Sequence, residues 1–307
     1  MKRKNRVLMA RQLPLHLMLL VPCALVFVYS YLPMSGLYMA FVKYVPTLDG
    51  FFPSLVKSKF VGLSTFRFLF ILPDTKRVFF NTLFIATMKI VADLVFPVAF
   101  ALLLNEVRTG WFKKTVQTIT YIPNFLSWVI LSGILLDVFS PRDGIVNQVL
   151  GHFGIQPIYF FGNPKIFPFM MVATEVWKSI GFNTIVVLAA ITGIDPALYE
   201  AAYIDGAGRL KQARHITVPS VMPIVTLLAI LSLGNILNAG FDQIFNFYSP
   251  SVYSSGDIVD TFVYRVGLLD GDFSRATAVG LLKSAVSLIM ISVSYWIANK
   301  FSNYRVF

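Results

Sequence analysis

The sequence predicts an all-α membrane protein whose chain crosses the bilayer six times. Its 307 residues are 56% hydrophobic and only 13% charged, whereas about 25% of the residues in a typical soluble protein are charged. Six apolar runs are long enough to cross a bilayer, which takes about 20 helical residues. Their approximate limits are residues 12–34, 79–105, 116–138, 167–191, 221–242 and 276–298.

Basic residues between these runs set the expected orientation. Lys and Arg are enriched in the cytoplasmic ends and short loops of membrane proteins, which accounts for the net charge of +11. We therefore expect the chain to lie in lipid and to have no nucleic-acid partner. Both termini are expected in the cytoplasm. Segment 35–81 is also basic, and we place it outside. The basic residues that share one side are Lys2, Arg3, Lys4, Arg6 and Arg11, then Arg108, Lys113 and Lys114, then Arg209, Lys211 and Arg214, and finally Lys300 and Arg305.

The first run is expected to be a retained helix that follows a short cytoplasmic segment, residues 1–11. A cleaved lipoprotein signal is the alternative, because Leu20-Val21-Pro22-Cys23 resembles its cleavage box. Pro22 is a poor residue before a cleaved bond, and the apolar run continues beyond Cys23. Residues 12–307 are thus predicted to form a single transmembrane domain.

Ionisable side chains inside the second and fourth runs are candidates for function. A charge at a helix centre costs about 2.5–3.5 kcal/mol on insertion scales. Lys89 and Asp93 are four residues apart, and Glu175 and Lys178 are three apart, so each pair can share one helix face. Pairing within each helix is the simpler interpretation, and contact with a substrate is the alternative.

A polar insert lies between the fourth and fifth runs. It comprises residues 195–219, DPALYEAAYIDGAGRLKQARHITVP. Asp195 can cap a helix that begins at Pro196, and Gly206 and Gly208 permit a break after it. A second helix is expected to follow and to stop near Pro219. Two short helices would make a compact cytoplasmic knob, and an amphipathic loop resting on the membrane is the alternative.

The fifth run carries polar residues spaced by three, three and four: Ser232, Asn235, Asn238 and Asp242. On a continuous helix this spacing places them on one face. Such a face either seals against neighbouring helices or lines an aqueous path. We hypothesise that this face and Trp177 line the outer half of a path across the membrane.

In the sixth run, Lys283 has no acidic residue one helical turn away. It must therefore meet another helix, a lipid headgroup or the path. Three lysines inside the predicted spans also raise the hypothesis of an acidic substrate. Local acidic partners for two of them weaken that hypothesis.

The insert resembles the EAA signature of permease subunits of bacterial ABC importers, in which EAA is followed by three residues, Gly, nine residues and I-x-L-P. The matching residues here are Glu200, Ala201, Ala202, Asp205, Gly206, Ile216 and Pro219. The resemblance implies coupling helices that dock on a cytoplasmic ATPase, with Glu200 facing its basic groups. Ala213 and Val218 depart from the aromatic residue and the Leu that are usual in the family.

Longer segments, among them FALLLNEVRTGWFKKTVQTITYIPNFLSWVI and VYRVGLLDGDFSRATAVGL, resemble the carbohydrate-uptake permeases and their polysaccharide and oligosaccharide subgroup. This resemblance implies a maltose-permease-type, type I ABC importer fold in the bacterial inner membrane. It also implies three partners: an ATPase dimer that uses ATP and Mg, a second permease that forms a heterodimer with this chain, and an extracellular or periplasmic solute-binding protein. A homodimer stays open. Because sugars need hydroxyl partners and flat apolar surfaces, we hypothesise that the polar face of the fifth run and Trp177 line a sugar path, and that an acidic substrate would be a uronate oligomer.

The sequence argues against other functions. A phosphate-binding loop needs G-x-x-x-x-G-K-[ST], and no Gly-Lys pair occurs, so this chain is expected to bind no ATP, metal or other cofactor. His16, His152 and His215 are too scattered for a metal motif, and nothing supports an enzyme. An ion-coupled secondary transporter or channel is the alternative, with Pro97 and Pro123 breaking helices at mid-membrane, but it leaves the EAA insert unexplained.

Overall fold

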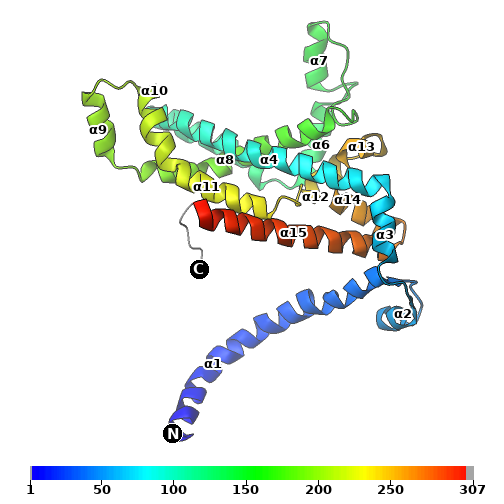
Figure 1. Cartoon of the computed structure of the whole chain (residues 1–307). Helices are drawn as coiled ribbons and strands as arrows, with labels where there is room; N and C mark the ends of the chain where they lie inside the picture. The colour runs from blue at the N-terminus through cyan, green and yellow to red at the C-terminus, as the bar shows by residue number, and fades with distance from the viewer. Residues whose placement is uncertain (1, 302–307) are drawn as a thin grey trace. The chain divides into compact units, whose positions relative to one another are not determined.

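The computed structural model describes residues 2–301, and the side chains of residues 14–296. The basic side chains of segment 1–11 and those of Lys300 and Arg305 therefore lie outside the described residues. The chain divides into two units (Figure 1). Unit 1 comprises residues 1–71 and 263–281, and unit 2 comprises residues 72–262 and 282–307.

The all-α membrane fold is confirmed. Within the described residues, five helical segments are long and apolar enough to cross a membrane: Pro14–Phe41, Pro73–Glu106, Phe167–Thr192, Arg209–Gly234 and Phe273–Trp296. A sixth crossing requires the bent pair Gly110–Phe125 and Trp128–Val138 to count as one span.

Unit 1 is built from the first helix and a small folded segment that follows it. α1 (Lys2–Val26) continues through a π-helical turn (η1, Phe27–Tyr31) into a 3-10 segment (η2, Leu32–Phe41). Two short strands, β1 (Val42–Lys43) and β2 (Lys59–Phe60), then pair antiparallel around α2 (Phe51–Lys57). The unit is completed by α3 (Ser64–Ile71), a π-helical turn (η6, Arg265–Leu269) and the beginning of α15 (Phe273–Phe301).

Unit 2 is organised around α4 (Pro73–Glu106), α8 (Phe167–Thr192) and α11 (Val218–Gly234), which pack against one another (Figure 1). Its other elements are α5 (Gly110–Tyr121), η3 (Ile122–Phe125), α6 (Trp128–Val138), α7 (Ile145–His152), α9 (Pro196–Ile204), α10 (Arg209–Gln212), η4 (Ala213–Thr217), α12 (Phe241–Phe247), η5 (Pro250–Val252), α13 (Tyr253–Gly256) and α14 (Val259–Tyr264).

Two apolar cores lie toward opposite ends of α4 and α8. The first contains Ile85 and Ala86 of α4 with Phe167 and Met171 of α8. The second contains Ala101 and Leu104 of α4 with Val187, Leu188 and Ile191 of α8. Between the two cores, α4 carries Lys89 and Asp93, and α8 carries Glu175, Lys178 and Ser179. We call this group of side chains the polar layer of unit 2.

The predicted third span, residues 116–138, is bent in the structure. α5 ends at Tyr121, a 3-10 turn that includes Pro123 follows, and α6 leaves at an angle of 108°. Proline lacks a backbone N–H and restricts the residue before it, so it favours a helix boundary at this point. Pro97, in contrast, lies inside the continuous helix α4.

Two further boundaries differ from the prediction. The fifth span ends at Gly234, and a non-helical segment separates α11 from α12. The second insert helix does not stop at Pro219, because α10 passes through the π-helical turn η4 directly into α11. Pro219 lies in the first turn of α11, where its missing N–H has no helical partner to lose.

Candidate functional site

The first half of the insert, α9, has well-defined ends. The Asp195 carboxylate caps its start by accepting a 2.9 Å hydrogen bond from the Ala197 N–H. At its end, the Ala207 N–H donates to the Ala202 carbonyl (2.8 Å) and the Gly206 N–H to the Tyr203 carbonyl (3.0 Å). This is a Schellman turn, and Gly206 adopts the left-handed conformation that it requires, with φ of +75°.

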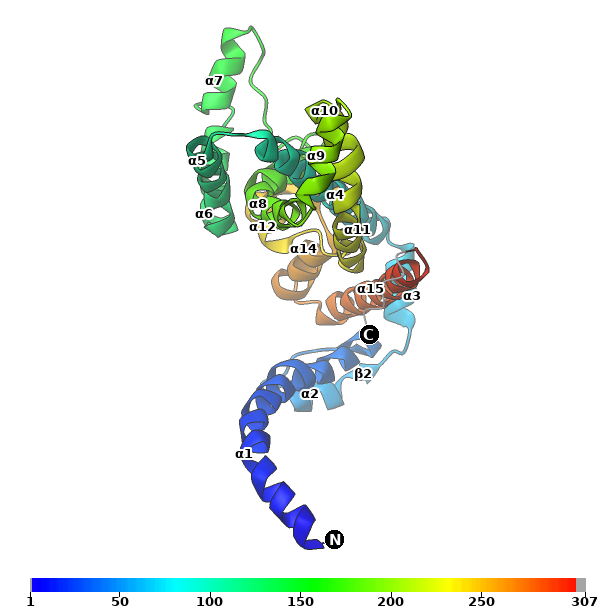
Figure 2. The same ribbon diagram turned by 90° about the vertical axis from the view of Figure 1, so that its left-hand side faces the viewer.

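The insert is fastened to two spans. The Tyr199 hydroxyl of α9 bonds to the Thr217 hydroxyl at 2.9 Å, which holds α9 against the start of α11. A salt bridge of 3.3 Å joins Arg209 of α10 to Glu106, the last residue of α4. Figures 1 and 2 place α9 and α10 together at one end of unit 2. The insert is thus a folded helical pair, as predicted.

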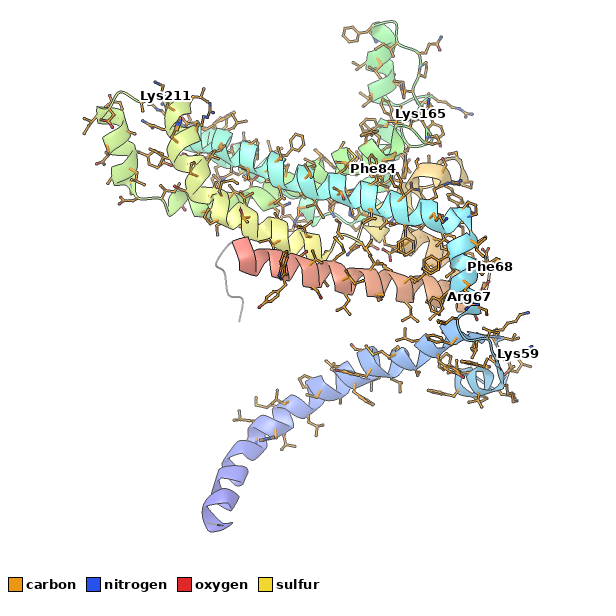
Figure 3. The ribbon with its side chains drawn as sticks, in the orientation of Figure 1. Lys59, Arg67, Phe68, Phe84, Lys165 and Lys211 are labelled. Carbon is orange, nitrogen blue, oxygen red and sulfur yellow. The ribbon has the colours of Figure 1, made fainter. Side chains whose placement is uncertain are left out.

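The insert has an exposed apolar surface that nothing in the described residues covers. The exposed fractions are 78% for Tyr203, 85% for Ile204 and 83% for Leu210. Glu200, Ala201 and Asp205 are exposed as well, while Ala202 and Ile216 are half-buried. Lys211, on the adjacent α10, lies at the same end of the unit (Figure 3). An exposed apolar surface bordered by charge is typical of a protein or membrane contact.

In the polar layer, the charged side chains pair between helices, which corrects the predicted pairing within each helix. Lys89 of α4 bonds to Glu175 of α8 at 3.3 Å. Asp93 accepts a 2.7 Å hydrogen bond from the Ser179 hydroxyl. Both contacts join residues 86 positions apart, so α4 and α8 run parallel and in register, and residues four apart on one helix face residues four apart on the other.

The remaining two predicted lysine sites also find partners elsewhere. The Lys178 ammonium lies 4.7 Å from the centre of the Trp128 ring on α6, a cation–π contact. Lys283 of α15 pairs with Asp260 of α14, as expected of a lysine that must meet another helix. The Trp177 side chain, predicted to line the path, is 47% exposed.

The predicted polar face of the fifth span is broken, because α11 ends at Gly234. Asn235 and Asn238 lie in the segment that follows, joined by a backbone bond of 2.8 Å, and Asp242 lies on α12. Both asparagines are exposed. Non-helical backbone at membrane depth persists only where it is buried in protein or lines a water-filled cavity.

Ser232, the remaining residue of the predicted polar face, lines a cavity. The cavity has a volume of about 200 Å³ and lies among α4, α8 and α11. Its polar lining comes from Asp93, Asn183 and Ser232, and its apolar lining includes Pro97 and Val187. The polar layer is therefore open enough to hold water or a small polar group.

Lys89 also holds the segment that separates α11 from α12. Its ammonium group donates to the Ala239 carbonyl at 2.7 Å and to the Gln243 side-chain oxygen. The Gln243 amide nitrogen in turn donates to the Met171 carbonyl (2.8 Å) and the Thr174 hydroxyl (2.7 Å) of α8. Gln243 is fully buried. Nothing in the local sequence, which reads Phe241-Asp242-Gln243-Ile244, predicts this role.

Sequence comparison identifies a protein family and close relatives. Residues 97–303 match the model of the family described as binding-protein-dependent transport system inner membrane component. A polygalacturonan/rhamnogalacturonan transport system permease protein, YteP of Bacillus subtilis (strain 168), is 38% identical over 100% of this chain and 94% of its own length. Protein LplB of the same organism is 39% identical over 94% of this chain and 90% of its own length.

Solved structures agree with these matches. A chain in the crystal structure of a bacterial ABC transporter involved in the import of the acidic polysaccharide alginate has a TM-score of 0.85 and 33% identity, covering 97% of this chain and 99% of that one. The bacterial alginate ABC transporter in complex with its alginate pentasaccharide-bound periplasmic protein gives a TM-score of 0.86 and 34% identity, covering 97% and 98%.

Proposed function

The chain belongs to the family of binding-protein-dependent transport system inner membrane components, and from that membership we propose that it is a permease subunit of an ATP-driven importer of acidic oligosaccharides or polysaccharides. It is a multi-pass inner membrane protein and a transport subunit of its family, not a catalytic one. The observation that carries the proposal is the insert: a rigid helical pair with an uncovered apolar surface beside Glu200, fastened to two spans.

The proposed partner of the insert is a dimer of cytoplasmic ATPases. Tyr203, Ile204 and Leu210 offer the apolar centre of a docking surface, and Glu200 offers a charge at its edge. Interfaces combine a buried apolar core with a polar rim in this way. ATP and Mg would be handled by the partner, since the sequence has no Gly-Lys pair for a phosphate-binding loop.

Movement of the insert would reach the polar layer through α4. The Arg209–Glu106 salt bridge connects the insert to one end of this helix, and Lys89 on the same helix bonds to Ala239 between α11 and α12. These two points lie 17 residues apart, or about 25 Å along a helix. We infer alternating access in which closure of the ATPases moves α4 and α11 together and reorients the path.

The proposed substrate follows from the named relatives and the chain's own charges. Relatives are named for polygalacturonan and for alginate, both polymers of uronic acids. A solute-binding protein would deliver the saccharide at the side opposite the insert, and a second permease would complete the path. With the insert in the cytoplasm, both termini are cytoplasmic and segment 35–81 is outside.

We propose that the exposed segment between α11 and α12 lines the path. Replacing Asn235 and Asn238 together with Ala should lower saccharide uptake about tenfold, since each lost hydrogen bond to a substrate is worth about 0.5–1.5 kcal/mol. ATPase association should be unchanged, because the insert is untouched. The measurement is initial uptake rate at matched expression, with Asn246→Ala on α12 as the control, and unchanged uptake would refute this role.

Reconstitution tests the function as a whole. The chain, a candidate second permease and candidate ATPases are placed in proteoliposomes with a solute-binding protein and a galacturonate hexamer. We expect uptake that requires ATP and every component. Uptake by this chain alone, driven by an ion gradient, would instead establish the alternative of a secondary transporter.

A further inference from the structure

A second pocket lies wholly within unit 1. Its volume is about 530 Å³, and it is formed by β1, α3 and the turn Asp270-Gly271-Asp272 before α15. That turn belongs to the segment VYRVGLLDGDFSRATAVGL, to which neither the insert nor the path assigns a role. In the proposed orientation the pocket is on the outer side.

The pocket walls are held together by hydrogen bonds between distant parts of the chain. The Ser274 hydroxyl donates to the Val42 carbonyl at 2.7 Å and accepts from the Tyr44 N–H at 2.9 Å. The Asp272 carboxylate accepts a 2.9 Å bond from the Arg275 N–H. Gly271 adopts φ of +73°, which permits the turn. The strand and the helix start are therefore fixed before any ligand binds.

The lining combines aromatic faces with charges of both signs. Phe68 of α3 is labelled in Figure 3. The Arg275 guanidinium lies 5.4 Å from the centre of the Phe68 ring, and Tyr44 also lines the pocket. Arg275 pairs with Asp272 at 3.1 Å, yet about a third of its side chain stays exposed (34%). Aromatic faces suit sugar rings, carboxylates accept from sugar hydroxyls, and a guanidinium recognises a carboxylate.

A separate observation indicates an anionic ligand. Lys43, which lines the pocket, lies directly opposite Lys59 in the β1–β2 ladder. Like charges directly opposite each other destabilise a strand pair. Both lysines are exposed, and among the side chains that the structure describes neither has a carboxylate within salt-bridge distance. An anion bound at this edge of the pocket would relieve their repulsion.

We propose that this pocket is an outer subsite for one uronate unit of the transported saccharide. The sugar ring packs on Phe68 and Tyr44, its carboxylate faces Lys43 and Arg275, and its hydroxyls donate to Asp270. The inference rests on the proposed function, whose acidic substrate it places at a second position, before the path through the polar layer.

The test uses the reconstituted complex in nanodiscs and trigalacturonate as the probe, with binding measured by calorimetry in the absence of ATP and of the binding protein. Lys43→Glu should weaken binding about tenfold or more, because it replaces an attraction with a repulsion, while Lys43→Arg should bind like the wild type. The matched control is Lys57→Glu, in the same unit but outside the pocket. Basal ATPase activity should be the same in all variants.

Three outcomes would overturn the proposal. The first is equal binding of trigalacturonate to the wild type and Lys43→Glu. The second is an equal loss for trigalacturonate and its neutral methyl ester, which would mean that the carboxylate is not recognised. The third comes from a separate titration with the solute-binding protein: weaker binding of that protein to Lys43→Glu, with no change for trigalacturonate, would make the pocket a protein contact. Because binding is measured without ATP, failure of ATP-driven uptake would refute the proposed function separately.

Discussion

Replacing Glu200 with Arg is expected to leave the permease folded and to abolish ATP-driven uptake. Glu200 is exposed on α9, and no ion pair involves it among the described residues, so the change should cost the fold no more than about 0.5 kcal/mol. At the proposed ATPase interface it would place a cation against basic groups. Loss of a buried charge pair costs about 2–5 kcal/mol, so affinity for the ATPase should fall about 30-fold or more.

The measurement is co-purification of the ATPase from membranes, together with uptake in proteoliposomes. Asp143→Arg is the matched control, because Asp143 is also an exposed acidic residue but lies before α7, outside the insert. We expect it to retain ATPase binding and uptake. If Glu200→Arg retained full coupling in a folded complex, the insert would not dock through this residue.

Replacing Lys89 with Ala is expected to destabilise unit 2 strongly. The Lys89 side chain is 8% exposed and supplies hydrogen bonds to Glu175, Ala239 and Gln243. Its removal leaves a carboxylate and two further acceptors without their donor. Breaking one partner of a buried ion pair costs about 3–5 kcal/mol, so the free energy of unfolding should fall by that amount, as measured by SDS-induced unfolding in mixed micelles.

Three further variants separate this effect from a general loss of lysine. Lys178→Ala removes a cation–π contact and should cost only about 0.5–2 kcal/mol. Lys89→Met combined with Glu175→Gln removes both charges while keeping volume, and should recover part of the stability lost in Lys89→Met alone. Equal stability of Lys89→Ala and the wild type would show that the Lys89 contacts contribute nothing to the fold.

Lys89 also explains why the path was harder to predict than the insert. The sequence places Lys89 and Asp93 one turn apart, and that spacing fits a pair within the helix. The structure pairs each with α8 instead, because α4 and α8 run parallel and in register. A side chain between two packed helices has partners on both, and spacing along one helix carries no information about the other.

The sequence by itself determined the membrane class, the family and the insert. The membrane class is predictable from composition and from the length of the apolar runs, because polar groups are costly in lipid. The insert is predictable because its caps and glycines act over only a few residues, as the hydrogen bonds of Asp195 and Gly206 confirm. Only the tertiary structure decided the end of α11 at Gly234 and the role of Gln243. These depend on long-range contacts, since a helix can end inside a membrane only where residues distant in sequence satisfy its backbone, as Lys89 does for Ala239.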